Sequence, residues 1–378
     1  MIYLDNASTT KPSDAVKNQI METLDIFGNP SSMHRLGIDA EKIIKKAKEN
    51  LSRSLKVNSN EVYFTSGGTE ANNTAILGYC RRNKKRGTHI ITSEIEHPSA
   101  REPFKRLEGE GFKVSYVKTL PSGEIDIFDF ENKLTSDTIF VSIMWVNNET
   151  GVIQPVEQLK PIMKKIAPNA ILHTDGVQAY GKIPTHPKSI GVDMMSISGH
   201  KIHAIKGIGA LYISNNLNID PYIIGGGQQN DMRSGTENVV GISALSKAIE
   251  DLTVDADFQK ISDLRSYFCE LIAQKIENIK FNGEGNLSPY ILNVSFPGIK
   301  AEILLHALEA RDIFVSTGSA CSTNKPMPSH VLGAMGCTKA EINGAVRFSF
   351  NNEITKDDIE KVAEILKFEV ETLRKVMR

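Results

Sequence analysis

The sequence lacks the features that mark membrane-spanning, secreted and nucleic-acid-binding proteins. Its longest apolar stretch, residues 139–146, is interrupted by Ser142 and is far too short to span a bilayer. The N-terminus has no basic region followed by an apolar core, as a signal peptide would have. Lys and Arg number 44 against 45 Asp and Glu, so no excess charge favours nucleic acid or a membrane as a partner. We therefore expect a cytoplasmic protein that binds neither directly.

Cysteine is also scarce, because 378 residues hold only four, and none of them form a CxxC pair. This excludes a disulfide scaffold and a cysteine-rich metal site, and we expect no bound metal. Cys321 lies in a stretch rich in Gly, Ser and Pro, residues 318–329, which predicts an irregular, exposed loop. An exposed thiol either has no role in a reaction or is a functional nucleophile, and the composition of the loop does not decide between these two interpretations. The other three cysteines, Cys80, Cys269 and Cys337, are interpreted as packing residues.

Short β-branched and apolar runs alternate with amphipathic helical patterns through the first two thirds of the chain. The predicted strands are 61–65, 89–93, 113–117, 138–146, 171–175, 194–198 and 210–213, and helical patterns between them include 70–84, 99–110 and 156–166. This alternation predicts an α/β fold with a mostly parallel, mixed sheet flanked by helices.

The pattern changes after about Val240. One long helical stretch from Ile242 past Cys269 is followed by predicted strands at 291–295, 314–316 and 345–350 and a closing helix over 356–376. We expect a large α/β domain over residues 15–250, and a smaller α+β domain formed by residues 1–14 and 251–378, which carries the Cys321 loop.

Polar side chains follow several predicted strands, at the edge where open α/β sheets bind ligands. Lys201 comes just after the strand 194–198, where a desolvated amine can form a Schiff base, although an ordinary loop lysine fits equally. Asp175 ends the strand 171–175 and either pairs with a pyridinium nitrogen or caps a helix. His97 and Asn148 also follow strands, and a histidine there is structural or catalytic.

Two further features suggest anion binding. Gly67 and Gly68 join a strand to a helix start, which predicts a phosphate cradle, although such a turn needs no ligand. Arg347 interrupts the strand-like run 345–350, where its guanidinium requires a planar acceptor. That acceptor is an internal carboxylate by default, or the carboxylate of a substrate.

The order of these motifs carries a resemblance over nearly the whole chain. They are Gly-Asn-Pro-Ser-Ser (28–32), Ser-Gly-Gly-Thr-Glu (66–70), Glu-His (96–97), Asn-Asn-Glu (147–149), Asp-Gly-Val-Gln (175–178), Ser-Gly-His-Lys (198–201), Arg-Ser-Gly-Thr (233–236), Gly-Ser-Ala-Cys (318–321) and Arg-Phe-Ser (347–349). In this order they resemble the group I cysteine desulfurases of the NifS/IscS type, which are fold type I pyridoxal-phosphate enzymes of the class V aminotransferase family. The Gly-Ser-Ala-Cys loop is what narrows the resemblance to this group.

The resemblance implies a pyridoxal 5'-phosphate site and a role for each matching residue. Lys201 would hold the cofactor as a Schiff base, Asp175 would bind the ring nitrogen, and His97 would stack on the ring and be the candidate for handling the substrate thiol proton. The remaining implied contacts are Gln178 and Asn148 with the ring hydroxyl or substrate, Gly68, Thr69, Ser198 and His200 with the phosphate, Thr236 with the phosphate in the partner subunit, and Asn29 and Arg347 with the substrate carboxylate.

The implied reaction converts L-cysteine to L-alanine and leaves the sulfur on Cys321 as a persulfide. An acceptor protein would then receive it, either an iron–sulfur scaffold or an enzyme that thiolates a cofactor or transfer RNA. The Thr236 contact makes a homodimer part of the expectation. The alternatives are a selenocysteine lyase, a class V aminotransferase that needs no loop thiol, and a non-catalytic assembly partner.

Overall fold

The computed structural model describes residues 1–215, 217–317 and 328–376. Its helices are α1 (Asp14–Leu24), α2 (Arg35–Leu55), α3 (Gly68–Asn73), α4 (Tyr79–Asn83), α5 (Pro98–Gly109), α6 (Ile127–Lys133), α7 (Val156–Ile166), α8 (Val239–Glu250), α9 (Val254–Lys275), α10 (Ala301–Glu309), α11 (His330–Ala334), α12 (Lys339–Asn343) and α13 (Lys356–Val376). Within the described ranges no helix is both long and apolar enough to cross a membrane.

The strands are β1 (Ile2–Tyr3), β2 (Val62–Thr65), β3 (His89–Ser93), β4 (Lys113–Val117), β5 (Thr138–Ser142), β6 (Ile171–Asp175), β7 (Met194–Ser198), β8 (Gly209–Ile213), β9 (Lys280–Asn282), β10 (Ile291–Ser295), β11 (Ile313–Phe314), β12 (Ser316–Thr317) and β13 (Ala345–Ser349). In the described part of the chain they form sheets of seven, four and two strands.

The large sheet has the order β2-β8-β7-β6-β5-β3-β4, and β8 alone runs antiparallel to its neighbours. Every residue of β3, β5, β6, β7 and β8 is buried, as expected for a sheet covered on both faces. Successive residues along a strand belong to different apolar clusters, because they point to opposite faces of the sheet. Ile91 of β3 and Val141 of β5 belong to one cluster, and Ile90 and Phe140 belong to the other. The predicted α/β fold class is confirmed.

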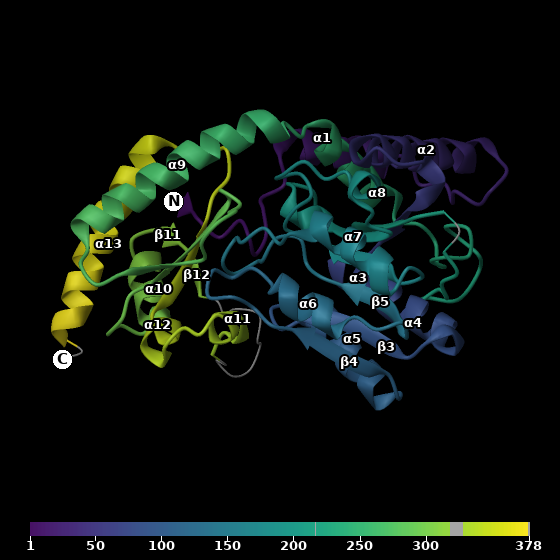
Figure 1. The fold of residues 1–378 in the computed structure, drawn as a ribbon. Coiled ribbons are helices and arrows are strands. Elements are labelled where there is room, and N and C mark those ends of the chain that lie inside the picture. The colour runs from purple at the N-terminus through teal and green to yellow at the C-terminus, as the bar shows by residue number, and fades with distance from the viewer. Residues whose placement is uncertain (216, 318–327, 377–378) are drawn as a thin grey trace.

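The smaller part is built around the antiparallel sheet β12-β13-β10-β9. The two long helices α9 and α13 lie together along its outer side, while α1, α2 and α8 form a layer against the large sheet (Figure 1). The first residues of the chain belong to this small part, because β1 pairs with β11 and both Ile2 and Leu4 are buried in its core. The domain boundaries at 14/15 and 250/251 remain a prediction.

The single long helix predicted from Ile242 past Cys269 is wrong, since α8 ends at Glu250 and α9 begins at Val254. The apolar residues of α8, such as Leu245 and Ile249, are buried in the core of the large sheet. Those of α9, such as Ile261 and Phe268, are buried in the core of the small sheet. The helix breaks where its apolar face changes from one core to the other.

Three other elements differ from the prediction by more than one residue at a boundary. The strand predicted over 138–146 ends at Ser142, after which the chain leaves the regular ladder but still donates hydrogen bonds to β6 from Ile143 and Trp145. The strand predicted over 314–316 is two short strands in different sheets, β11 and β12. The helix predicted over 70–84 begins at Gly68 and contains a wider π-type turn over Thr74–Gly78.

Candidate active site

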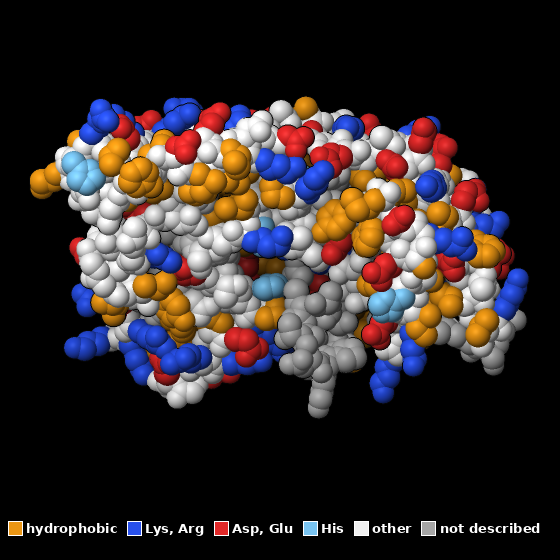
Figure 2. Space-filling model, turned by 180° about the vertical axis from the view of Figure 1, so that it is seen from behind, with side chains coloured by type: hydrophobic (Ala, Val, Ile, Leu, Met, Phe, Trp, Pro, Cys, Tyr) orange, Lys and Arg blue, Asp and Glu red, His pale blue; other side chains and the backbone are white. Residues whose placement is uncertain are grey.

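The carboxyl ends of the parallel strands bring the predicted polar residues to one edge of the large sheet. Asp175 is the last residue of β6, Ser198 is the last residue of β7, and Lys201 follows in the turn Gly199–Lys201. His97 follows β3 and caps α5. Figure 2 shows a hollow near the centre of one face of the molecule, with histidine and basic side chains at its rim. The predicted location of the site, at this edge of the sheet, agrees with the strand order.

The carboxylate of Asp175 is 5% exposed and is held from two sides. Asn72 Nδ2 donates to Oδ2 at 2.7 Å, and the backbone N–H of Val177 donates to Oδ1 at 2.9 Å. The second bond closes a local turn, and the alternative of a helix cap is wrong, because residues 177–182 form turns and no helix follows Asp175. The first is not local, since it fixes the carboxylate from helix α3, and Asn72 was not anticipated from the sequence.

Lys201 is half-buried and its amine points at the N-terminal segment. Its Nζ donates to the carbonyl oxygens of Ala7 at 2.6 Å and of Ser8 at 2.7 Å. The alternative of an ordinary exposed loop lysine is therefore wrong. The amine lies near other charged groups, because both Lys182 and His200 have pKa values that Lys201 helps to lower.

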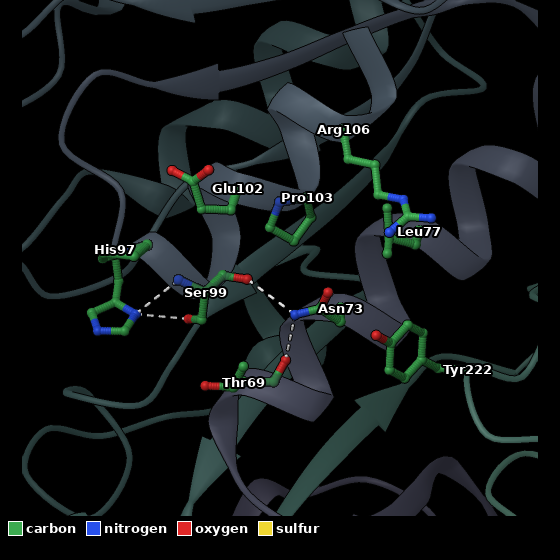
Figure 3. Close-up of a pocket in the computed structure, with 10 residues that line it drawn as sticks. Thr69, Asn73, Leu77, His97, Ser99, Glu102, Pro103, Arg106 and Tyr222 are labelled. Atoms are coloured by element: carbon green, nitrogen blue, oxygen red, sulfur yellow. Dashed lines mark hydrogen bonds between the residues drawn. The ribbon is translucent and has the colours of Figure 1, made fainter. Parts of the chain in front are cut away.

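His97 combines a structural role with a place in the site. Its Nδ1 lies 2.8 Å from Ser99 Oγ and accepts from the Ser99 N–H at 3.1 Å, which caps α5 (Figure 3). The imidazole lines a cavity of about 450 Å³ together with Thr69 and Tyr222. Burial lowers its pKa, against the effect of Asp175, and the charges of Lys201 and Arg347 lower it further. The ring is therefore held neutral, and because Nδ1 accepts from the Ser99 N–H, its proton lies on Nε2.

Glu96, next to His97, is a buried acid that the sequence reading did not single out. Its Oε1 accepts from Ser93 Oγ at 2.6 Å and from the Met144 N–H at 3.0 Å, whereas Oε2 has no partner in the described structure. Burial raises its pKa to about 8, and the nearby Asp175 adds to this rise. Glu96 is therefore mostly protonated at neutral pH.

The glycine turn forms a close-packed cradle at the start of α3. A Cβ on Gly68 would lie 2.7 Å from Val177 Cγ2 and 3.5 Å from Ser198 Cβ, so this backbone needs glycine. Gly67 has φ of +149°, which also favours glycine. Thr69 is exposed beside them. The glycine turn and the start of α3 therefore lie against Ser198. The prediction of a phosphate cradle requires this contact.

His200 lies on the other side of Ser198. Its Nδ1 is 3.2 Å from Thr9 Oγ1, and burial together with the charge of Lys201 lowers its pKa to about 4. The imidazole is therefore neutral at physiological pH, so it offers a hydrogen bond to a ligand rather than a charge.

Arg347, in the middle of β13, points at the same N-terminal segment. Nη2 donates to Asp5 Oδ1 at 3.0 Å and to Ser8 Oγ at 2.6 Å, and Nη1 donates to the backbone oxygen of Asn148 at 2.7 Å. The default interpretation of an internal salt bridge is confirmed. The guanidinium still keeps one buried donor, Nε, without a partner in the described residues.

The segment from Asp5 to Thr10 is the part of the site that the sequence reading missed. It accepts from Lys201 at Ala7 and Ser8, from Arg347 at Asp5 and Ser8, and from Gln178 Nε2 at the Ala7 oxygen, 2.8 Å away. It reaches the site by pairing with β13, where Asn6 Nδ2 donates to the Ser349 oxygen 343 residues away. The only signal in the sequence is a run of small polar residues directly after a short apolar stretch.

Three predicted site residues are not joined to this group. Asn29 is exposed in the connection between α1 and α2, where its Oδ1 accepts from the Ser31 N–H. Thr236 is exposed and lines a separate cavity beside the glycine turn, with Ser66 and Arg233. Cys321 lies outside the described residues. The proposed roles of all three stay predictions.

The other cysteines fit their interpretation as packing residues. Cys80 is completely buried, and Cys269 and Cys337 are half-buried against the two cores. Burial raises the pKa of each thiol, so none of these three is favoured as a thiolate nucleophile.

Comparison with known families decides the relationship. The family model described as "Aminotransferase class-V" matches residues 2–362. The chain belongs to the class V aminotransferase family. Within this family it is 40% identical to the cysteine desulfurase IscS of Dictyoglomus turgidum, over 99% of this chain and 96% of the relative.

Solved structures of this family place the chain in the same group. A NifS-like protein superimposes with a TM-score of 0.93 at 34% identity, covering 98% of this chain and all of the other. A structure described as SspA in complex with cysteine superimposes with a TM-score of 0.83 at 32% identity, covering 93% and 99% of the two chains. The resemblance to the NifS/IscS type is therefore confirmed.

Proposed function

We propose that this class V family member is a pyridoxal-phosphate-dependent cysteine desulfurase that passes sulfur from L-cysteine to Cys321. The observation that carries the proposal is the arrangement of Asp175, Lys201 and His97 at one edge of the sheet, near enough that Asp175 and Lys201 both affect the pKa of His97. Relatives named as cysteine desulfurases at about 40% identity support the choice of reaction.

The residues present fit the cofactor. Asp175 is a buried carboxylate held rigidly by Asn72, as a partner for a protonated ring nitrogen must be. Gly68 packs closely against Val177 and Ser198, so the start of α3 lies directly beside the end of β7, where the phosphate would bind. When bound, pyridoxal phosphate withdraws electrons from the bonds around the substrate α-carbon.

Lys201 would attach the cofactor and then act on the substrate. Its Nζ is kept in place by the carbonyl oxygens of Ala7 and Ser8, which accept hydrogen bonds from an amine in either charge state. Once displaced by the substrate amine, the freed Nζ would remove the proton from the α-carbon of cysteine. His97, whose ring is held neutral by burial, would be the residue that handles the proton of the substrate thiol.

Arg347 would bind the α-carboxylate of the substrate. Although it is already paired with Asp5, its Nε is buried without a partner in the described residues, so it can accept a further planar anion. Asn148 adjoins the guanidinium through its backbone oxygen, which supports its proposed contact with the ring hydroxyl or substrate. Asn29 would assist in binding the carboxylate from the α1–α2 connection.

Cys321 would take up the sulfur. Its thiolate attacks the sulfur atom of the bound cysteine, so that an S–S bond forms and the C–S bond breaks with its electron pair moving to the substrate carbon. Protonation of that carbon gives alanine, and the sulfur remains on Cys321 as a persulfide. An acceptor protein, an iron–sulfur scaffold or a thiolation enzyme, would then remove it.

A second copy of the chain would complete the site through Thr236. Large apolar side chains are exposed on the end of α1, the following connection and the start of α2: Met21, Leu24, Phe27, Met33, Leu36 and Ile38. Such a concentration of exposed apolar side chains marks a protein interface. It supports a homodimer in which each Thr236 reaches the phosphate of the partner's cofactor.

The test is absorbance and product formation by Lys201→Ala beside a matched control. Wild type loaded with pyridoxal phosphate should absorb in the near-visible range and release alanine from L-cysteine. Lys201→Ala should lose the band and lower alanine formation by roughly 10³-fold or more. Lys206→Ala, an exposed neighbour after the same strand, should keep both. A wild type that forms no band, or a Lys201→Ala variant that still forms alanine at the wild-type rate, would contradict the proposal.

A further inference from the structure

Lys182 is a buried lysine close to the site, and none of the reaction steps above requires it. It lies four residues after Gln178 in the turns that follow β6, so the two side chains are neighbours on one side of the backbone. Lys182 is 5% exposed, and its Nζ donates to Gln178 Oε1 at 2.6 Å. Its other close neighbour is the ring of Tyr290, whose centroid is 6.0 Å from Nζ.

This environment is unfavourable for a positive charge. No acidic group in the described residues is found to stabilise Lys182, whereas burial, together with the charges of Lys201 and Arg347, lowers its pKa to about 7. An apolar side chain would be accommodated there at lower cost, because a buried cation without a carboxylate partner destabilises the folded state. A costly buried lysine beside an active site is a candidate for a functional role.

The hydrogen bond from Lys182 determines which way the carboxamide of Gln178 is turned. Because Lys182 Nζ donates this bond, the oxygen of the Gln178 carboxamide faces it. The Nε2 group is therefore turned the other way, where it donates to the Ala7 oxygen at 2.8 Å. The same carbonyl accepts from Lys201 Nζ at 2.6 Å, so the Gln178 donor is held beside the amine that would attach the cofactor.

We infer that Lys182 is a positioning residue, which fixes the carboxamide of Gln178 with its N–H donors toward the cofactor site. This inference rests on the proposed function. In pyridoxal phosphate the ring hydroxyl oxygen is next to the carbon that bears the aldehyde, so an N–H donor beside Lys201 suits that oxygen. The reversed carboxamide would present an oxygen to an oxygen. Without Lys182, the carboxamide is held by its bond to the Ala7 oxygen alone, so the reversed orientation costs one hydrogen bond instead of two.

The first test compares Lys182→Met with Lys160→Met. Methionine replaces the amine by an apolar group of similar length. Lys160 is the control because it is also largely buried, but it pairs with Asp193 and the Ala170 oxygen, away from the site residues. Lys182→Met should bind pyridoxal phosphate roughly tenfold more weakly, as expected for one lost hydrogen bond, and should shift the pH midpoint of its near-visible absorbance. Lys160→Met should leave both values unchanged.

A double-mutant cycle asks whether Lys182 acts through Gln178. In a Gln178→Leu background, Lys182→Met should cause no further change in cofactor affinity or in the absorbance midpoint, because the group it orients is gone. If Lys182→Met does not fold, Lys182→Arg serves in the same cycle, since a cavity of about 220 Å³ borders Lys182 and leaves room for the guanidinium. Arg keeps the donors, so it should retain affinity within a few-fold and alter the midpoint only when Gln178 is present.

The outcomes are separable from those of the proposed function. If wild type binds the cofactor and turns over cysteine, but Lys182→Met has wild-type affinity and midpoint, the inference is overturned while the function stands. Equal effects of the Lys182 substitution with and without Gln178 would also overturn it, because a purely structural role predicts such additivity. If wild type binds no cofactor, the proposed function itself fails.

Discussion

One buried carboxyl group near the candidate site, that of Glu96, is kept neutral by its surroundings. Glu96 has a hydroxyl and one backbone N–H as donors, too few to offset burial, and its pKa rises to about 8. Keeping Glu96 neutral removes a second negative charge from the neighbourhood of Asp175.

Replacing Glu96 by Gln should therefore change the pH dependence of stability. Between the ordinary value of 4.5 and a folded pKa of about 8, the unfolded chain releases a proton that the folded protein keeps, so wild-type stability falls as pH rises. Glu96→Gln removes this loss, and its stability relative to wild type should rise by up to about 1.4 kcal/mol per pH unit over that window. Urea unfolding at pH 5, 6, 7 and 8 measures it.

Glu61→Gln is the matched control, with the opposite sign. Glu61 is equally buried, but hydrogen bonds from the N–H groups of Asn58 and Asn215 and from Lys188 outweigh burial and lower its pKa. Its contribution is present above pH 4.5 and is lost as pH falls through the folded pKa, so Glu61→Gln should cost most at neutral pH. A constant difference between Glu96→Gln and wild type from pH 5 to 8 would show that Glu96 is ionised.

At the level of elements, the strands of the large sheet were predictable and the helix breaks were not. β3, β4, β6 and β7 match their predicted ranges because each is a compact run of apolar and β-branched residues bounded by polar ones. The division between α8 and α9 depends on which core each apolar face meets, and no local pattern contains that information. The wider turn at Thr74–Gly78 is likewise set by packing.

The same distinction holds for the site. His97, Asp175, Ser198 and Lys201 could be predicted, because strand ends in a parallel sheet share an edge. Asp5, Ala7 and Ser8 could not, since they reach that edge only through pairing with β13 near the other end of the chain. Asn72 was missed for a similar reason, as it contacts Asp175 across 103 residues.

The start of the short helix α11 is joined to the buried Glu149 by one side chain, Ser329. Ser329 caps α11 by accepting from the Leu332 N–H at 3.1 Å and donates to the buried Glu149 Oε2 at 2.5 Å. Ser329→Ala should cost about 1–2 kcal/mol of unfolding free energy, since it removes a cap and leaves Glu149 without this donor. Chemical denaturation measures the change.

Ser13→Ala is the matched control for that substitution. Ser13 caps α1 by accepting from the Val16 N–H at 3.2 Å, and no hydrogen bond from its hydroxyl to a buried acid is found in the described structure. We expect it to cost about 0.5–1 kcal/mol, which is the cap alone. Equal losses for the two variants would mean that the bond to Glu149 adds no stability.

At the scale of the whole molecule, the proposed dimer predicts that two inactive variants restore activity when they are paired in one dimer. If Lys201 of one subunit and Thr236 of the other complete each site, a mixture of two inactive variants should regain activity. Lys201→Ala and Thr236→Asp, unfolded together and refolded as random dimers, should give about a quarter of wild-type activity, because half are hybrids with one intact site. Each variant refolded alone is the control. No recovery in dimers that have formed would contradict the shared site.

The claim most central to this account is that Cys321 receives the sulfur of cysteine. Intact-protein mass spectrometry after one turnover with L-cysteine, in the absence of reductant, tests it most directly. Wild type and Cys337→Ala should each become heavier by one sulfur atom, located on the peptide that contains Cys321. Cys321→Ala should keep the near-visible absorbance of the bound cofactor and gain no sulfur. A Cys321→Ala protein that still releases alanine and sulfide from cysteine at the wild-type rate would contradict the account.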